Sequence, residues 1–246
     1  MQGREGHWEQ AIESLEKAAE LEPGKNEIYT NLSLAYAEKK DFDNAVAKAN
    51  KAVETDPKNG NSYLALGLAY EGKGDAAEAV KAYQQGAQSD TKNADLHIML
   101  GNLYGKQGDF EEAIAAYERA IQADDSKLFA YSNIAYAYQE KGDHEKALEY
   151  LLKATQVAPK DAVAWYDLGA AYGKQGEPAK AIEAYQRSHE ADPKFYKACL
   201  SLALALEDSG DLEQASEYYV KALSLTDDPQ LKEAILRQVS RAGQKN

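Results

Sequence analysis

The chain has 246 residues and a net charge of −13, with 41 acidic against 28 basic side chains. This balance disfavours nucleic acid and anionic lipid as ligands, because both are bound by clustered Lys and Arg. The single cysteine, Cys199, excludes an intramolecular disulfide and a CxxC site, and no apolar run reaches the ~20 residues of a membrane span.

A period of 34 residues organises the chain. Three classes of residue keep it in one register: a tyrosine, an alanine and a Gly-acid pair. They are Tyr36, Tyr70, Tyr104, Tyr138 and Tyr172; Ala45, Ala79, Ala113, Ala147, Ala181 and Ala215; and Gly74-Asp75, Gly108-Asp109, Gly142-Asp143, Gly176-Glu177 and Gly210-Asp211, with Lys40-Asp41 in the first such position. Agreement of independent classes predicts a repeat architecture.

Each period predicts two helices, as residues 162–195 illustrate. Trp165, Leu168 and Tyr172 share one face of a first helix. Gly176 is suited to end that helix, since the position after a helix favours left-handed backbone angles. Glu177 and its Asp counterparts are expected to cap the second helix.

These residues resemble the tetratricopeptide repeat family, in which W-x2-L-G-x2-Y is followed by A-x3-F/Y and then P. The best-matching repeat carries Trp165, Leu168, Gly169, Tyr172, Ala181, Tyr185 and Pro193. The resemblance implies an all-α fold, a right-handed α-solenoid of 34-residue helix-turn-helix repeats forming one domain over residues 1–246. It also implies an interaction scaffold whose first helices line a concave groove that binds an extended segment of a partner protein.

In chain order, residues 1–25 match only the second half of a repeat. A second helix without its partner is expected to expose Ile12 and Leu15. We therefore expect the chain to begin inside a longer protein, or another chain to cover this face as in a homo-oligomer. The cytoplasm is the default location, and a periplasmic or secreted one stays open.

Six full repeats follow, and the last of them departs most from the pattern. It has Cys199, Leu206 and Asp227 in the Trp, Tyr and Pro positions. Residues 230–246 are expected to hold an amphipathic capping helix and a tail. The full repeats are 26–59, 60–93, 94–127, 128–161, 162–195 and 196–229.

Nothing in the sequence indicates an enzyme, a cofactor or a metal site. The four histidines, His7, His97, His144 and His189, occupy unrelated repeat positions, whereas a metal site needs ligands that converge. The Gly-Lys turns lack the GxxxxGK[ST] pattern and a preceding strand.

Ten residues are predicted to line the groove. Asn31, Asn133 and Asp167 share one repeat position, and an Asn amide can both donate to and accept from the backbone of an extended peptide. Apolar and aromatic side chains beside such polar groups are typical of recognition surfaces. The predicted set is Asn31, Leu68, Met99, Asn102, Lys106, Asn133, Tyr136, Tyr166, Asp167 and Lys174.

Charge narrows the expected partner. The groove positions carry eight acids (Glu27, Glu38, Glu71, Asp95, Glu140, Asp167, Glu207, Asp208) against three bases (Lys106, Lys174, Lys197). Family members that clamp a C-terminal carboxylate do so with several Lys or Arg side chains together with Asn. Asn102, Asn133 and Lys106 partly match that set. Ile98 and Val163, however, occupy positions where the clamp needs cations. We predict no such clamp and a neutral to basic partner segment with apolar anchors.

Two alternatives stay open at this point. The chain could be the repeat region of a larger enzyme or of a secretion or assembly protein, or it could self-associate through its incomplete first repeat.

Overall fold

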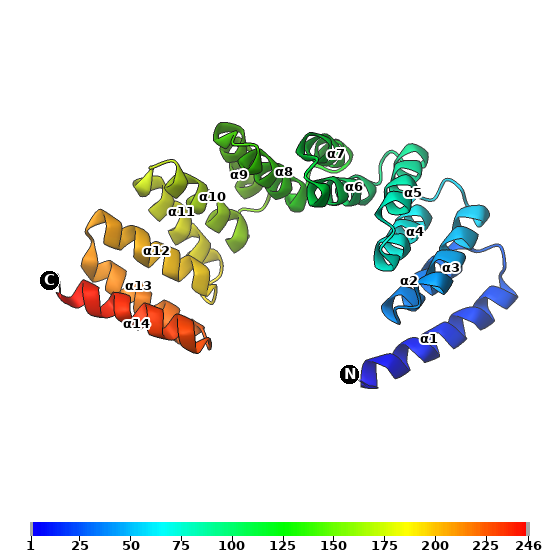
Figure 1. Cartoon of the computed structure of the whole chain (residues 1–246), viewed down its shortest axis with the longest axis horizontal. Helices are drawn as coiled ribbons and strands as arrows, with labels where there is room; N and C mark the ends of the chain where they lie inside the picture. The colour runs from blue at the N-terminus through cyan, green and yellow to red at the C-terminus, as the bar shows by residue number, and fades with distance from the viewer. Residues whose placement is uncertain (1, 245–246) are drawn as a thin grey trace. The chain divides into compact units, whose positions relative to one another are not determined.

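The computed structural model describes the backbone of residues 2–244 and the side chains of residues 7–240. Throughout this part of the chain the regular structure is helical, without strands, which confirms the all-α prediction (Figure 1). The helices are α1 (Gln2–Leu21), α2 (Asn26–Glu38), α3 (Phe42–Thr55), α4 (Gly60–Lys73), α5 (Ala76–Ser89), α6 (Ala94–Gln107), α7 (Phe110–Ala123), α8 (Leu128–Glu140), α9 (His144–Val157), α10 (Ala162–Lys174), α11 (Pro178–Ala191), α12 (Tyr196–Ser209), α13 (Leu212–Leu225) and α14 (Pro229–Gln244).

The turn inside each helix pair follows from the Gly-acid dipeptide. Gly74 ends α4 with φ +88°, and its N–H donates to the Glu71 carbonyl. Asp75 then caps α5 by accepting a hydrogen bond from the Glu78 N–H. Lys40 takes the same left-handed position in the first full repeat, with φ +60°, a conformation that an L side chain adopts only at a steric cost.

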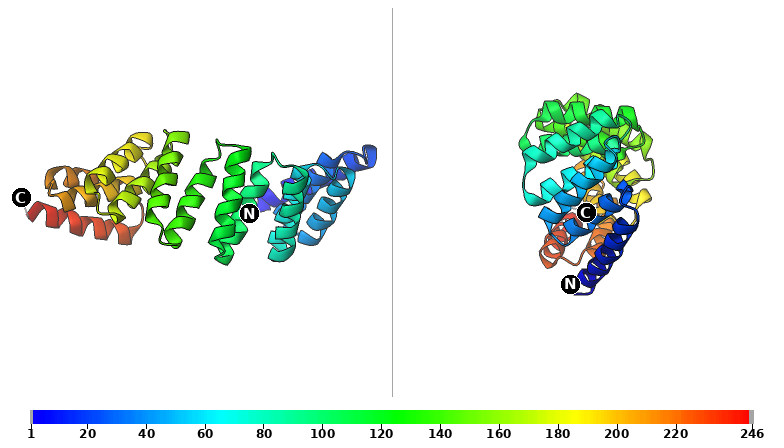
Figure 2. Two further views of the ribbon diagram at one scale, coloured as in Figure 1. Left: turned by 90° about the horizontal axis from the view of Figure 1, so that it is seen from above. Right: turned by 90° about the vertical axis from the view of Figure 1, so that its right-hand side faces the viewer.

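Helix pairs pack into two compact units, residues 1–130 and 131–246. In the first unit, α2 packs on α3, α4 on α5 and α6 on α7, and each pair also contacts the next. In the second unit, α10 packs on α11 and α12 on α13, while the Tyr138 and Tyr150 rings stack between α8 and α9. The left view of Figure 2 shows the helices of each unit stacked in chain order.

A glycine and a tyrosine set the spacing within three of the pairs. A Cβ atom added to Gly67, Gly101 or Gly169 would lie 2.1, 2.5 or 2.7 Å from a ring atom of Tyr83, Tyr117 or Tyr185, respectively. The tyrosine is 16 residues after the glycine in each case. In residues 128–161 the corresponding pair is Ala135 and Leu151. Ala135 is larger than the glycine of the other pairs, and Leu151 is smaller than their tyrosine.

The ends of the described chain are covered to different degrees. Ile12 and Leu15 are half-buried against the cluster of Ile28, Tyr29 and Leu32, so the expectation that they are exposed is wrong. Helix α1 packs on α2, and this contact partly covers the two side chains.

At the other end, α14 packs on α13. Its Ile235 is 1% exposed, and Leu231 and Val239 are half-buried beside it. Within residues 2–244, no helix combines the length and apolar character that a bilayer crossing requires.

Gly101→Ala tests the spacing contact, with Gly105→Ala as its matched control on the same helix. We expect Gly101→Ala to lower the free energy of unfolding by about 1–3 kcal/mol, because the added methyl group would force the buried Tyr117 ring to shift. Gly105 faces open space, so its replacement should be neutral or stabilise by up to ~1 kcal/mol. Thermal unfolding of both variants measures the difference; equal effects would contradict the account.

Candidate functional site

A cavity of about 220 Å³ lies between α8, α9 and α10 in the second unit. Three of the ten predicted groove residues, Tyr136, Asp167 and Lys174, line it together. Its remaining walls are Ser132, Ala135, Gln139, Leu151, Ala170 and Ala171. We call this space the α8–α10 pocket. The pocket combines an apolar floor with a few polar groups, the composition typical of recognition sites.

Asp167 is the unusual group in the α8–α10 pocket. Its side chain is half-buried, and across residues 7–240 no side chain or backbone group forms a hydrogen bond or ion pair with its carboxylate. Burial, reinforced by the negative charge of Asp161, raises the pKa of Asp167 to about 6, against a smaller opposing effect of Lys197. The carboxylate is therefore ionised at neutral pH at a cost to the fold.

Tyr136 and Lys174 complete the exposed rim of the pocket. Tyr136 on α8 is 55% exposed although it is a large aromatic residue. Lys174 on α10 is exposed as well. Lys174 follows Asp167 by seven residues on α10, which is two turns or ~10 Å along the axis. The pocket thus has an acidic end and a basic end.

A second cavity repeats the first one period later. The α10–α12 pocket, of about 450 Å³, is lined by Gly173, Gly176, Pro178, Ala181, Tyr185, Ser201, Leu204, Ala205 and Asp208. Gly173, Tyr185, Ser201, Leu204, Ala205 and Asp208 are each 34 residues after a residue of the α8–α10 pocket. The two cavities are therefore successive copies of one feature of the repeat.

In the first unit, two predicted polar groove residues are bonded to other residues of the chain. The Tyr117 hydroxyl donates to Oδ1 of Asn102 at 2.7 Å. Lys106 forms an ion pair with Glu71 on α4, with 3.3 Å between Nζ and Oε2. Both side chains therefore connect elements of the fold, and Lys106 is not the isolated cation that a carboxylate clamp needs.

The other predicted residues are placed as follows. Asn31 is exposed on α2, Leu68 on α4 is half-buried, and Met99 on α6 packs against the core around Leu96 and Leu100. Asn133 on α8 is half-buried.

Tyr166 lies beside two other rings, with centroid distances of 5.8 Å to Tyr185 and 5.4 Å to Phe195. It therefore acts as a packing residue between α10, α11 and the start of α12.

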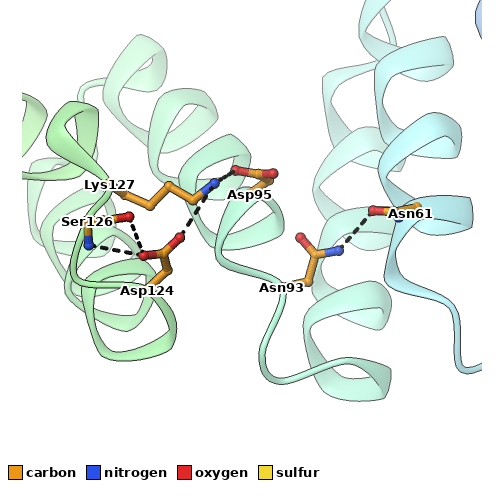
Figure 3. Close-up of polar contacts among 6 residues, drawn as sticks. All are labelled: Asn61, Asn93, Asp95, Asp124, Ser126 and Lys127. Carbon is orange, nitrogen blue, oxygen red and sulfur yellow. Dashed lines mark hydrogen bonds and ion pairs between the residues drawn. The ribbon is translucent and has the colours of Figure 1, made fainter.

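A polar edge joins successive repeats in the first unit (Figure 3). Asn93 donates to Oδ1 of Asn61 at 3.2 Å, and one repeat later Lys127 contacts Oδ1 of Asp95 at 2.8 Å. A cavity of about 340 Å³ lies here, but the polar groups drawn in Figure 3 are bonded to one another. We interpret this edge as a structural link between repeats.

Sequence reasoning missed an acid that bonds the packing tyrosine. The Tyr83 hydroxyl donates to Glu71 and the Tyr219 hydroxyl to Glu207, both at 2.7 Å. Each glutamate precedes its tyrosine by 12 residues, so the repeated spacing was the available signal. Glu71 and Glu207, counted among the groove acids above, thus belong partly to the packing.

The environment of the single cysteine does not activate its thiol. Cys199 is buried, its Sγ lies 3.3 Å from Nδ1 of His189, and burial raises the pKa of its thiol. A raised pKa disfavours the nucleophilic thiolate. Among the residues whose side chains are described, no group of three or more His, Cys, Asp or Glu is arranged to hold a metal ion.

Comparisons with known proteins agree with the repeat pattern. Models of the tetratricopeptide repeat match residues 2–60, 49–81, 94–126, 126–194 and 174–238. A search of curated protein sequences gave no match.

Several solved structures are similar. One is that of MamA, at 30% identity and a TM-score of 0.59 over 69% of this chain and 96% of MamA. YrrB, described as a tetratricopeptide repeat protein with an unusual peptide-binding site, is 24% identical with a TM-score of 0.57, over 76% of this chain and 96% of YrrB. The C-terminal part of a repeat protein from Cytophaga hutchinsonii shares the fold at 18% identity, with a TM-score of 0.74 over 94% of this chain and 95% of that one.

Asp167→Asn should stabilise the protein at neutral pH. The pKa of Asp167 is raised from 3.8 to about 6 by folding, so the wild type loses stability as pH rises through that window. At pH 7 we expect the variant to be more stable by up to about 3 kcal/mol, and near pH 4 the two should converge. Asn stands at the same position in Asn31 and Asn133, so it suits the helix.

Chemical denaturation at both pH values measures this, with Glu183→Gln, an exposed acid on α11, as the control for net charge. A variant that is equally or less stable at pH 7 would show that the Asp167 carboxylate is not strained.

Proposed function

Because this chain belongs to the tetratricopeptide repeat family, whose proteins act as protein-interaction scaffolds, we propose that its second unit binds an extended segment of a partner protein along α8, α10 and α12. The recurrence of one cavity at the 34-residue period carries the proposal. Two equivalent cavities in register suit a chain that presents side chains to successive repeats.

The side chains around the two cavities support this assignment. Tyr136 and Leu204, which occupy one repeat position on α8 and α12, are exposed at 55% and 40%. Between them, a Cβ atom added to Gly173 would have no heavy atom within 4 Å, so a peptide backbone can approach α10 closely there. Exposed aromatic and aliphatic groups beside polar ones supply the apolar anchors predicted for the partner.

The proposal keeps the view that the partner is a protein segment and that the chain itself catalyses no reaction. It places the binding in the second unit, because the groove positions Asn102, Lys106 and Glu71 of the first unit already bond within the fold. YrrB, with its peptide-binding site, is one similar structure whose description fits this proposal.

A double substitution tests the proposal. Tyr136→Ser with Leu204→Ser should weaken capture of peptides from a randomised library by at least about tenfold, because it removes the apolar anchor from both cavities while changing only exposed positions. Leu152→Ser on the second helix α9, a residue that is 37% exposed, is the matched control and should leave capture unchanged. Equal capture by the wild type and both variants would refute binding at these cavities.

Asn102→Ala does not test the groove cleanly. It removes the hydrogen-bond acceptor of the Tyr117 hydroxyl, so it lowers stability as well as changing the groove. Lys106→Ala is more informative. We expect it to leave peptide capture unchanged, because Lys106 is paired with Glu71. Binding of a free acidic C-terminal tail that disappears in Lys106→Ala, measured by fluorescence anisotropy, would contradict the absence of a carboxylate clamp.

A further inference from the structure

The repeat position of Asp167 is uncharged in every other full repeat. It holds Asn31, Ala65, Met99, Asn133 and Ser201 in the others. A carboxylate therefore enters this position once, at the wall of the α8–α10 pocket. The packing of the repeat does not require it, because five other side chains serve in the same place.

The Asp167 carboxylate has no hydrogen-bond or ion-pair partner in the described part of the fold. No hydrogen bond or ion pair to it forms among residues 7–240, and the nearby Asp161 carboxylate, which caps α10 through the Ala164 N–H, adds repulsion. Lys197 on α12 offsets the charge only in part. A half-buried charge that destabilises its own fold and faces a cavity is a candidate for ligand recognition.

The pocket is shaped for one long side chain. Its volume of about 220 Å³ far exceeds the roughly 30 Å³ share of a single water molecule. Ala135, Leu151 and Ala171 form an apolar floor, and Tyr136 offers an exposed ring at the rim. Aliphatic stems of Lys and Arg pack on such surfaces, and an aromatic face attracts their cationic heads.

The charges of Asp167 and Lys174 also determine which end of the pocket a cationic side-chain head occupies. Lys174 stands two turns from Asp167 on the same helix and repels a cation, so a cationic head is stable only at the Asp167 end. The α10–α12 pocket has Ser201 in place of Asp167 and Leu204 beside it, so it offers no equivalent charge at that position. The two pockets therefore differ in the side chains that they favour.

We propose that the α8–α10 pocket takes a Lys or Arg side chain of the bound segment, with its cationic head against Asp167 and its stem along Tyr136, Leu151 and Ala171. The inference rests on the proposed function and makes it specific: the partner segment carries a basic residue at the position that meets α10.

The test uses positional selection from a randomised peptide library on the whole chain. We expect the wild type to enrich Lys or Arg at one position, and Asp167→Asn to lose that enrichment while still capturing peptides through the apolar anchors. A peptide selected by the wild type should bind the variant about tenfold more weakly. Glu183→Gln on α11, which makes the same change in net charge, should retain both enrichment and affinity.

Peptides captured without basic enrichment, or with enrichment that persists in Asp167→Asn, would overturn the inference and leave the proposed function standing. Enrichment of acidic residues that is lost in Lys174→Gln would overturn it in favour of an anionic side chain at the other end of the pocket.

If neither the wild type nor any variant captures a peptide from the library, the result would instead count against the proposed function. The inference is then decided by nuclear magnetic resonance titration with N-acetyl-lysine amide as the probe. Shifts around Tyr136 and Asp167 that Asp167→Asn abolishes would support it, and their absence, or equal shifts with N-acetyl-glutamate amide, would refute it.

Discussion

The contact between a second-helix tyrosine and a first-helix glycine governs how closely the helices of a pair approach. The Tyr83, Tyr117 and Tyr185 rings occupy the space that a side chain at Gly67, Gly101 and Gly169 would need. A buried tyrosine must also find a partner for its hydroxyl. Glu71 and Glu207 accept that hydrogen bond where the repeat has a glutamate 12 residues earlier.

The two repeats around the cavities depart from this arrangement. Both residues are present in Glu71 with Tyr83 and in Glu207 with Tyr219, where the tyrosine hydroxyl donates to the glutamate. In residues 128–161 Gln139 and Leu151 stand in place of the glutamate and the tyrosine, and in residues 162–195 Gly173 stands in place of the glutamate. Gln139 and Leu151 line the first pocket, and Gly173 lines the second.

Asp167 adds a negative charge to a pocket in which Lys174 is the other charged lining residue. The Asp167 carboxylate lowers stability at neutral pH and lines the pocket, so its contribution to the protein is the proposed binding and not stability. In the first unit, two charged groups at groove positions are paired: Lys106 with Glu71 and Asp95 with Lys127. Asp167 has no such partner among the described side chains.

The sequence predicted the helix pairs and their turns well, because the Gly-acid dipeptide and the apolar spacing act within a few residues. It predicted the site less well. Asn102 and Lys106 were predicted from the pattern of a single helix, whereas their partners, Tyr117 and Glu71, lie on other helices and are distant in sequence. Ile12 and Leu15 were expected to be exposed because residues 1–25 match only half a repeat, whereas residues of α2 partly cover them. The pocket itself depends on Leu151 from another helix, which no groove pattern includes.

Photo-crosslinking of a captured peptide to the whole chain tests most directly whether the second unit provides the binding surface. A benzophenone in the peptide should label α8, α10 and α12 within residues 132–139, 167–174 and 201–208, and excess unlabelled peptide should suppress the reaction. Labelling mainly on α2, α4 and α6, or on the second helices α9, α11 and α13, would contradict the account.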